Sequence, residues 1–147
     1  MKNNLSFYLS AILIILTSCQ KDENKYEQFF SEELQLSSSE RANSYYYFIN
    51  TNSCSGCLEI NNFFLLENGL NVLKLIFVGD MESRGFFNRN DYNYNFWEIR
   101  EVKEPLVFKY DIYTNDPLLV KFDSNGKLEF TKNIKVEEIQ KLVELVN

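Results

Sequence analysis

Two cysteines separated by two residues are the side chains of this sequence best suited to chemistry. They stand in Cys54-Ser55-Gly56-Cys57, directly after a strand-like run at residues 45–49. In the first turn of a helix, two cysteines at this spacing have sulfurs close enough to pair. A thiolate there faces unpaired backbone N–H groups and the positive end of the helix dipole, which lower its pKa below the free value of about 8.5. The motif therefore predicts a dithiol able to exchange with disulfides.

The residues alone leave three interpretations of this pair open. It can be a redox-active dithiol, a static disulfide that closes a short loop, or part of a metal site. Zinc takes four ligands, and the chain has 3 cysteines in total and no histidine. Without histidine no Ser/His/Asp catalytic set can form, and no glycine-rich phosphate loop is present. We therefore predict no metal site and no cofactor.

The remaining cysteine, Cys19, closes an apolar run near the N-terminus. The mostly apolar residues 5–16 are too few for a transmembrane helix, which needs about 20. Thr17 and Ser18 then precede Cys19, and this pattern resembles the lipobox of bacterial lipoproteins, whose cysteine is lipidated and becomes the new N-terminus. We expect residues 1–18 to be a lipoprotein signal peptide and Cys19 to be the lipidation site. The alternative is an ordinary signal peptide that happens to contain a cysteine.

The residues after Cys19 bear on where the protein is held. Residues 20–23, Gln-Lys-Asp-Glu, resemble the export signal by which some Gram-negative bacteria send lipoproteins to the cell surface. The alternative is a solvated polar tether, which we expect to span residues 19–25. The expected location is the bacterial cell envelope, lipid-anchored in the outer membrane on its periplasmic or outer side, where disulfides persist. The net charge of −6 and the lack of a Lys/Arg cluster exclude nucleic acid as the expected partner.

The hydrophobic pattern predicts the elements that position the Cys-x-x-Cys motif. The unbroken aromatic and β-branched run at residues 45–49 predicts a strand buried on both faces. From Cys57 the pattern turns helical, with apolar positions at Ile60, Phe63 and Phe64. Gly69 stands where such a helix would end. Residues 72–78 predict a second buried strand, so the motif falls at the start of the helix in a parallel β-α-β unit.

The second half of the chain predicts a hairpin and a closing helix. Pro117 precedes a strand at residues 118–122, and Asn125-Gly126 is a strong hairpin signal. Apolar positions from 136 to 146 predict one face of a final helix. The other segments have less regular patterns, which predict a helix at residues 26–41, a helix within residues 81–97 and an extended segment at residues 106–113.

This order of elements resembles the thioredoxin fold, and in particular the membrane-tethered, TlpA-like thiol-disulfide oxidoreductases. The resemblance covers residues 45–147. It depends on Cys54 and Cys57 after the first core strand, and on residues 114–117, Thr-Asn-Asp-Pro, before the strand that the hairpin turn ends. It implies an α/β thioredoxin-like domain at residues 26–147, with a central mixed β-sheet flanked by helices.

The resemblance also implies an activity and a role for each site residue. The activity is exchange of disulfides with the thiols or disulfides of partner proteins, at a membrane reached through the lipid anchor. Cys54 is then the attacking thiol and Cys57 the more buried resolving thiol. Pro117 matches the cis-proline of the fold, and the alternative is a trans proline at the start of an edge strand.

Three departures from the family pattern bear on redox strength. Ser53 stands where an aromatic residue usually precedes the first cysteine, and the strand before the motif carries no acid. Asp116 beside the thiolate would raise the cysteine pKa and make the disulfide less oxidising. The alternative function is a redox-silent thioredoxin-fold lipoprotein that acts as a binding or scaffold module with a structural disulfide. An exposed Cys54 beside a cis Pro117 favours the enzyme, whereas a disulfide covered by residues 84–104 favours the scaffold.

Overall fold

The computed structural model describes residues 25–91, 97–112 and 114–146. The expected signal peptide, Cys19 and the surface-export sequence lie outside these ranges, as does part of the helix expected within residues 81–97. Among the helices that the structure describes, none combines the length and the hydropathy that crossing a membrane requires.

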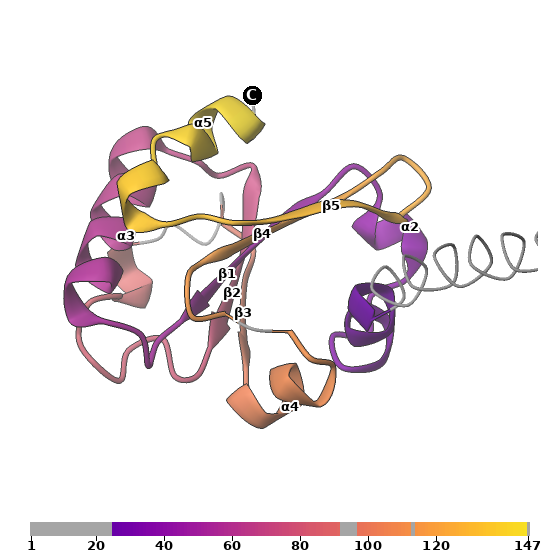
Figure 1. Ribbon diagram of the computed structural model, residues 1–147, viewed down its shortest axis with the longest axis horizontal. Coiled ribbons are helices and arrows are strands. Elements are labelled where there is room, and N and C mark those ends of the chain that lie inside the picture. The colour runs from indigo at the N-terminus through magenta and orange to yellow at the C-terminus, as the bar shows by residue number, and fades with distance from the viewer. Residues whose placement is uncertain (1–24, 92–96, 113, 147) are drawn as a thin grey trace, which may run out of the picture.

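A five-stranded mixed sheet forms the centre of the described chain, in the order β3-β2-β1-β4-β5 (Figure 1). The strands are β1 (Tyr45–Asn50), β2 (Leu73–Val78), β3 (Ile99–Val102), β4 (Leu118–Phe122) and β5 (Leu128–Asn133). β1, β2 and β3 run parallel to one another, whereas β4 pairs antiparallel with β1 and β5 antiparallel with β4. The hydrophobic runs thus correctly predict β1, β2 and β4, and β1 is the middle strand.

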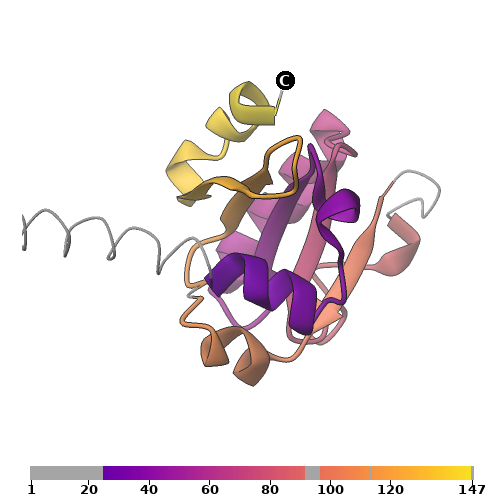
Figure 2. The same cartoon turned by 90° about the vertical axis from the view of Figure 1, so that its right-hand side faces the viewer.

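Helices cover both faces of this sheet (Figures 1 and 2). One face carries α3 (Ser55–Asn68), the 3-10 turn η2 (Val136–Glu138) and α5 (Lys141–Val146). The other face carries a helix at residues 25–32 and α4 (Glu104–Lys109). The short α2 (Ser38–Arg41) lies against the β4–β5 turn, where a Cβ on Gly126 would stand 2.0 Å from the carbonyl oxygen of Ser38.

Two hydrophobic clusters fill the spaces between the sheet and its helices. Because successive side chains of a strand point to opposite faces, β1 contributes to both. Tyr46 and Phe48 pack toward the helix at residues 25–32, and Tyr47 and Ile49 pack toward α3. All four side chains are fully buried, which explains why this run of the sequence shows no polar alternation.

The β-α-β unit, the antiparallel hairpin and the closing helix are arranged as the thioredoxin-like resemblance implies. The expected fold class, α/β with a central mixed sheet flanked by helices, is therefore confirmed. α3 also ends as predicted, because Gly69 takes the left-handed conformation (φ 57°, ψ 39°) and its N–H is donated to Leu65 O.

Two expected helices are interrupted. The helix expected at residues 26–41 divides into residues 25–32 and α2, because Gln35 adopts a positive φ of 55° and Ser37 caps a new helix with Glu40. The expected C-terminal helix divides into η2 and α5. Within residues 81–97 the described part forms turns and the 3-10 helix η1 (Arg89–Asp91), so the expected helix is wrong there.

The segment expected to be extended at residues 106–113 is helical over most of its described length. It belongs to α4, which has Pro105 in its first turn. A proline fits there because the first N–H groups of a helix have no partner within the helix. Val107 is fully buried against the sheet, so packing selects the helical form over the strand that the apolar run suggested.

Candidate functional site

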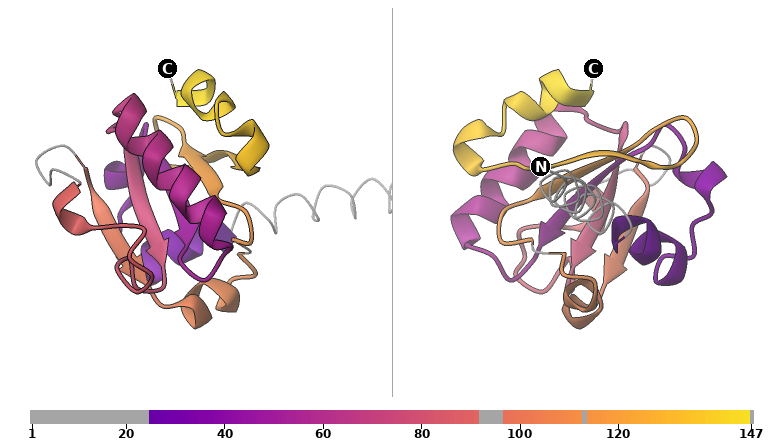
Figure 3. Two further views of the ribbon diagram at one scale, coloured as in Figure 1. Left: turned by 90° about the vertical axis from the view of Figure 1, so that its left-hand side faces the viewer. Right: turned by 45° about the vertical axis from the view of Figure 1, so that its right-hand side comes forward.

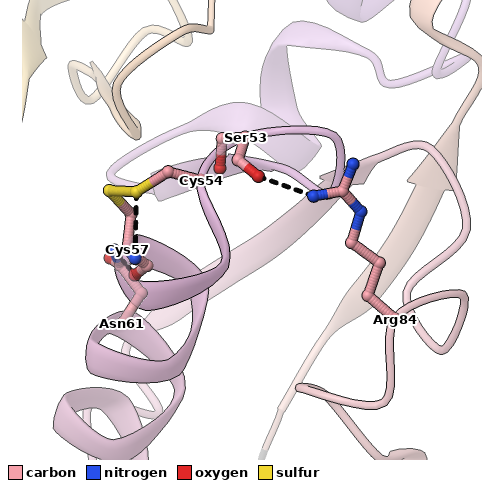
Figure 4. Close-up of a disulfide and its surroundings, with 5 residues drawn as sticks. All are labelled: Ser53, Cys54, Cys57, Asn61 and Arg84. Carbon is pink, nitrogen blue, oxygen red and sulfur yellow. Dashed lines mark hydrogen bonds between the residues drawn. A yellow bond between two sulfur atoms is a disulfide. The ribbon is translucent and has the colours of Figure 1, made fainter.

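Cys54 and Cys57 form a disulfide at the N-terminal end of α3 (Figure 4). Cys54 is the N-cap residue of the helix, with extended backbone (φ −62°, ψ 137°), and the two Cα atoms are 5.2 Å apart. Cys54 is exposed and Cys57 is half-buried. A reactant approaching from solvent therefore reaches the sulfur of Cys54 first.

The helix end offers a favourable electrostatic environment to a thiolate. Cys54 Sγ accepts the backbone N–H of Cys57 at 3.1 Å, and the first turn of α3 contains no acidic residue. A reduced Cys54 would therefore have its negative charge stabilised by a backbone donor and by the helix dipole. Glu59 lies one turn further along the helix and is exposed to solvent.

A buried polar pair lies beneath the disulfide. The hydroxyl of Tyr47 donates to Asn61 Oδ1 at 2.8 Å, and Asn61 Nδ2 donates to the backbone carbonyl of Cys57, also at 2.8 Å. Both side chains are almost fully buried, and burial raises the pKa of Tyr47, so its hydroxyl stays a neutral donor. The pair holds the helical turn that carries Cys57, and it contains no carboxyl that could take up a proton.

Sequence reasoning missed this pair, although one signal was available. Asn61 falls one residue beyond Ile60 and four after Cys57, on the face of α3 where Leu58 and Leu65 are buried. A side-chain amide on a buried helix face needs a hydrogen-bond partner. Here the partner is Tyr47 of β1, the middle strand. A polar residue on the buried face of the helix was therefore the signal for a contact with β1.

The loop that precedes the disulfide is fixed to the end of β2. The backbone N–H of Thr51 donates to Val78 O at 3.0 Å, and its side-chain hydroxyl donates to the same carbonyl oxygen at 3.1 Å. Gly79 follows with a positive φ of 106°, and a Cβ at this position would stand 2.2 Å from Thr51 Oγ1. Only glycine fits this turn, because it combines a positive φ with a close approach between the two loops.

Two side chains from outside the loop hold its outer part. Arg84 Nη1 donates to the carbonyl of Ser53 at 2.9 Å, from the side of the loop away from the disulfide (Figure 4). Glu104, at the start of α4, accepts from the amides of Asn50 and Asn52 at 3.3 and 3.4 Å. The carbonyl of Ser53, the residue before Cys54, is therefore held by the guanidinium of Arg84.

Pro117 does not adopt the expected form. No peptide bond among the described residues is cis, so the Asp116–Pro117 bond is trans and the expectation of a cis-proline is wrong. Pro117 is buried directly before β4, and its carbonyl accepts the N–H of Ile134 at 2.7 Å. This hydrogen bond continues the β4–β5 pairing one residue before the start of β4. Proline is tolerated at this position although it has no N–H to donate.

The insert at residues 84–104 does not cover the disulfide in the part of it that the structure describes. Cys54 is exposed, and Trp97 packs into the cluster on the α3 side of the sheet with 8 % of its surface accessible. Across residues 25–91, 97–112 and 114–146, no group of three or more Cys, Asp or Glu side chains is placed to hold a metal ion.

Comparisons with known proteins yield one structural likeness. No protein-family model matches the chain, and no curated protein is significantly similar to it. The chain is similar to the crystal structure of the pneumococcal exposed lipoprotein thioredoxin from Streptococcus pneumoniae, with 16 % identity and a TM-score of 0.40. The likeness covers 74 % of this chain and 89 % of that one. At this TM-score the likeness decides nothing about function, which has to be inferred from the residues of this chain.

Proposed function

We propose that this protein is a membrane-anchored thiol-disulfide oxidoreductase that acts through Cys54 and Cys57. The observation that carries the proposal is an exposed Cys54 at the N-terminus of α3, joined by a disulfide to a half-buried Cys57. In a thioredoxin-like fold such a pair supports redox chemistry, because one sulfur is accessible and the other is held behind it. The partners would be thiols or disulfides of other proteins.

In the reduced protein, the thiolate of Cys54 would attack a disulfide of the partner. The new bond joins Cys54 to one partner sulfur, and the other partner sulfur leaves as a thiolate that takes a proton from solvent. Cys57 then loses its proton and attacks Cys54, which releases the second partner thiol and forms the Cys54–Cys57 disulfide. Two electrons pass to the partner. A separate dithiol protein must then supply two electrons to reduce the Cys54–Cys57 disulfide again. The reverse sequence oxidises a partner dithiol.

The surroundings of the pair favour a reducing potential. The Tyr47–Asn61 pair beneath Cys57 offers no carboxylate to accept the proton of Cys57. Asp116 precedes Pro117, and a negative charge there beside the thiolate would make the disulfide less oxidising. We expect a potential near the lower end of the range for such motifs, roughly −270 to −120 mV. Equilibration with glutathione buffers measures it.

Alkylation and trapping distinguish this enzyme from a scaffold. After reduction, a thiol reagent near neutral pH should modify Cys54 faster than Cys57. Cys57→Ser should trap mixed disulfides with partner proteins because the resolving thiol is absent, and Cys54→Ser should trap none. If Cys54 resists alkylation and Cys57→Ser captures nothing, the pair is a structural disulfide. The redox-silent scaffold then replaces the enzyme.

The anchor is a separate part of the proposal. Acylation at Cys19 would hold the domain at the outer membrane, so Cys19→Ala should release or misprocess the protein. A wild-type mature protein that is soluble with an unmodified N-terminus would contradict this. If residues 20–23 direct export to the surface, replacing Lys21, Asp22 and Glu23 with Ala should keep the lipid but strand the protein inside. Equal protease accessibility of both forms on whole cells would count against export.

A further inference from the structure

The outer face of α3 carries large apolar side chains that no other described element covers. Phe63 is 65 % exposed, Ile60 44 % and Leu66 37 %. The inner face of the same helix is packed, with Leu58, Asn61 and Leu65 buried. Seen from this side, α3 lies in front of the sheet with no described element across it (Figure 3, left).

This face is hollowed as well as apolar. An open groove of about 580 Å³ is lined by Glu59, Asn62, Phe63, Leu66 and Glu67. The two glutamates stand at its ends and flank the apolar floor, and α3 contains no Lys or Arg. Neither glutamate has an ion-pair partner among the residues that the structure describes. The groove therefore combines an apolar floor with two unpaired negative charges.

We propose that this groove docks a segment of a partner protein in which an apolar side chain is flanked by Lys or Arg. The apolar side chain would cover Phe63 and Leu66, and the basic residues would meet Glu59 and Glu67. Charge complementarity selects this partner, because like charges placed together across an interface cost several kcal/mol. A second copy of the chain is disfavoured for that reason, since two α3 helices face to face would bring four carboxylates together.

A lipid surface is disfavoured by where the chain enters the domain. The helix at residues 25–32 lies on the sheet face opposite α3. From Cys19 to Lys25 the chain spans at most about 20 Å. Three layers of helix, sheet and helix are about 30 Å thick. If Cys19 is acylated, as the proposed function has it, the outer face of α3 points away from the bilayer.

The groove lies on the helix that begins at the disulfide. Glu59 is five positions after Cys54, which corresponds to about 8 Å along the helix axis. A partner held in the groove therefore has its neighbouring residues within reach of the Cys54 sulfur. The groove would act as a docking surface for the redox partner, and in this respect the inference rests on the proposed function.

A pair of peptides without cysteine tests the groove alone. The probe is a fluorescein-labelled peptide Lys-Lys-Leu-Phe-Leu-Lys-Lys, and its twin has Glu in place of Lys. Binding to the full chain is followed by fluorescence anisotropy. We expect the basic peptide to bind and the acidic twin to bind at least about tenfold more weakly, with affinity for the basic peptide falling as salt rises.

Matched variants locate the binding. Phe63→Ser should weaken binding at least about tenfold, because a buried aromatic anchor dominates such contacts, whereas Phe108→Ser on α4, which is 43 % exposed, should not change it. Glu67→Lys should weaken binding and Glu129→Lys on β5 should not. No binding, equal binding of the two peptides, or equal effects of Phe63→Ser and Phe108→Ser would each overturn the proposal.

Two further measurements test the other occupants. Self-association that Phe63→Ser abolishes, seen by sedimentation, would overturn the proposal in favour of a second copy. Binding to phosphatidylglycerol vesicles that depends on Phe63 would overturn it in favour of lipid. The double variant Cys54→Ser/Cys57→Ser should bind the peptide as the wild type does. Failure of the peptide tests and failure of the alkylation tests are therefore separate results.

Discussion

The face of the sheet under the helix at residues 25–32 is filled with aromatic rings, whereas the face under α3 is mainly aliphatic around one polar pair. On the first face, seven ring contacts join Phe29, Phe30, Tyr46, Phe48, Tyr110 and Phe122 at centroid distances of 4.5 to 5.9 Å. On the second face the hydroxyl of Tyr47 bonds to Asn61, which in turn bonds to Cys57.

The two faces of the sheet therefore differ in what their side chains support. Tyr46 and Tyr47 are neighbours in β1 and equally buried, but they face opposite clusters. The hydroxyl of Tyr46 has no hydrogen-bond partner among the described residues, whereas that of Tyr47 supports the helix that carries the disulfide. The aromatic cluster packs beneath the helix at residues 25–32, and the α3 face holds the turn that carries the Cys54–Cys57 disulfide.

Phe30→Ala should have the largest effect on stability. Phe30 contacts four other rings, and its removal leaves a cavity that tightly packed aromatic neighbours fill poorly. We expect the free energy of unfolding of the oxidised protein to fall by about 3–5 kcal/mol, measured by denaturant titration. Phe63→Ala on the exposed face of α3 is the control, with a change within about 0.5 kcal/mol. A loss below about 1 kcal/mol for Phe30→Ala would contradict the role of the aromatic cluster.

Tyr47→Phe should distinguish the two tyrosines of β1. Removing this hydroxyl leaves Asn61 Oδ1 buried without its donor, which costs about 1–3 kcal/mol of stability. Tyr46→Phe is the matched control and should change stability by less than about 0.5 kcal/mol. We also expect Tyr47→Phe to shift the reduction potential of the Cys54–Cys57 pair, because the turn that carries Cys57 loses its support. If the two substitutions had equal effects on the free energy of unfolding and on the reduction potential, the proposed difference between the two faces would be wrong.

Arg84→Ala should act locally at the loop before the disulfide. The guanidinium is exposed and makes one hydrogen bond with Ser53, so the free energy of unfolding should change by less than about 1 kcal/mol. Amide hydrogen exchange at residues 51–54 should become several-fold faster, because the carbonyl of Ser53 loses its donor. Lys135→Ala, on an exposed loop, serves as the control. Unchanged exchange at these residues would show that Thr51 and Glu104 hold the loop without Arg84.

Acid pH should weaken each face modestly through its own carboxylate. Hydrogen bonds from Lys109 and Tyr110 lower the pKa of Glu33 on the aromatic side, and a hydrogen bond from Lys141 lowers the pKa of Glu138 on the α3 side, both from the ordinary 4.5. A carboxyl whose pKa is lower in the folded state stabilises the fold above the unfolded value. Stability should therefore hold above about pH 4.5 and decline as the pH falls through the folded values.

The carboxylate on each face can be tested separately. Denaturant midpoints between about pH 3 and about pH 6 measure the decline. Lys109→Met should flatten the part due to Glu33, and Lys141→Met the part due to Glu138. A profile that neither substitution alters would show that these carboxylates contribute nothing to acid sensitivity.

The sequence by itself determined the elements whose signals are local. β1, β2 and β4 are continuous apolar runs because strands buried on both faces need no polar alternation. The end of α3 follows from Gly69, because a left-handed residue stops a helix. The Cys-x-x-Cys spacing places the two sulfurs close enough to pair, and the structure joins them in a disulfide.

Only the tertiary structure decided which faces are buried and which distant residues meet. The spacing of Ile60, Phe63 and Phe64 indicated a helix but not its buried face. The structure turns Leu58, Asn61 and Leu65 inward and leaves Ile60 and Phe63 exposed. Periodicity marks the existence of a helix face, and the surface it packs against selects which face is buried. The hydrogen bond from Tyr47 to Asn61 and the support of Ser53 by Arg84 depend in the same way on partners far along the chain. The local sequence does not predict such contacts, because the partners come together only when the chain folds.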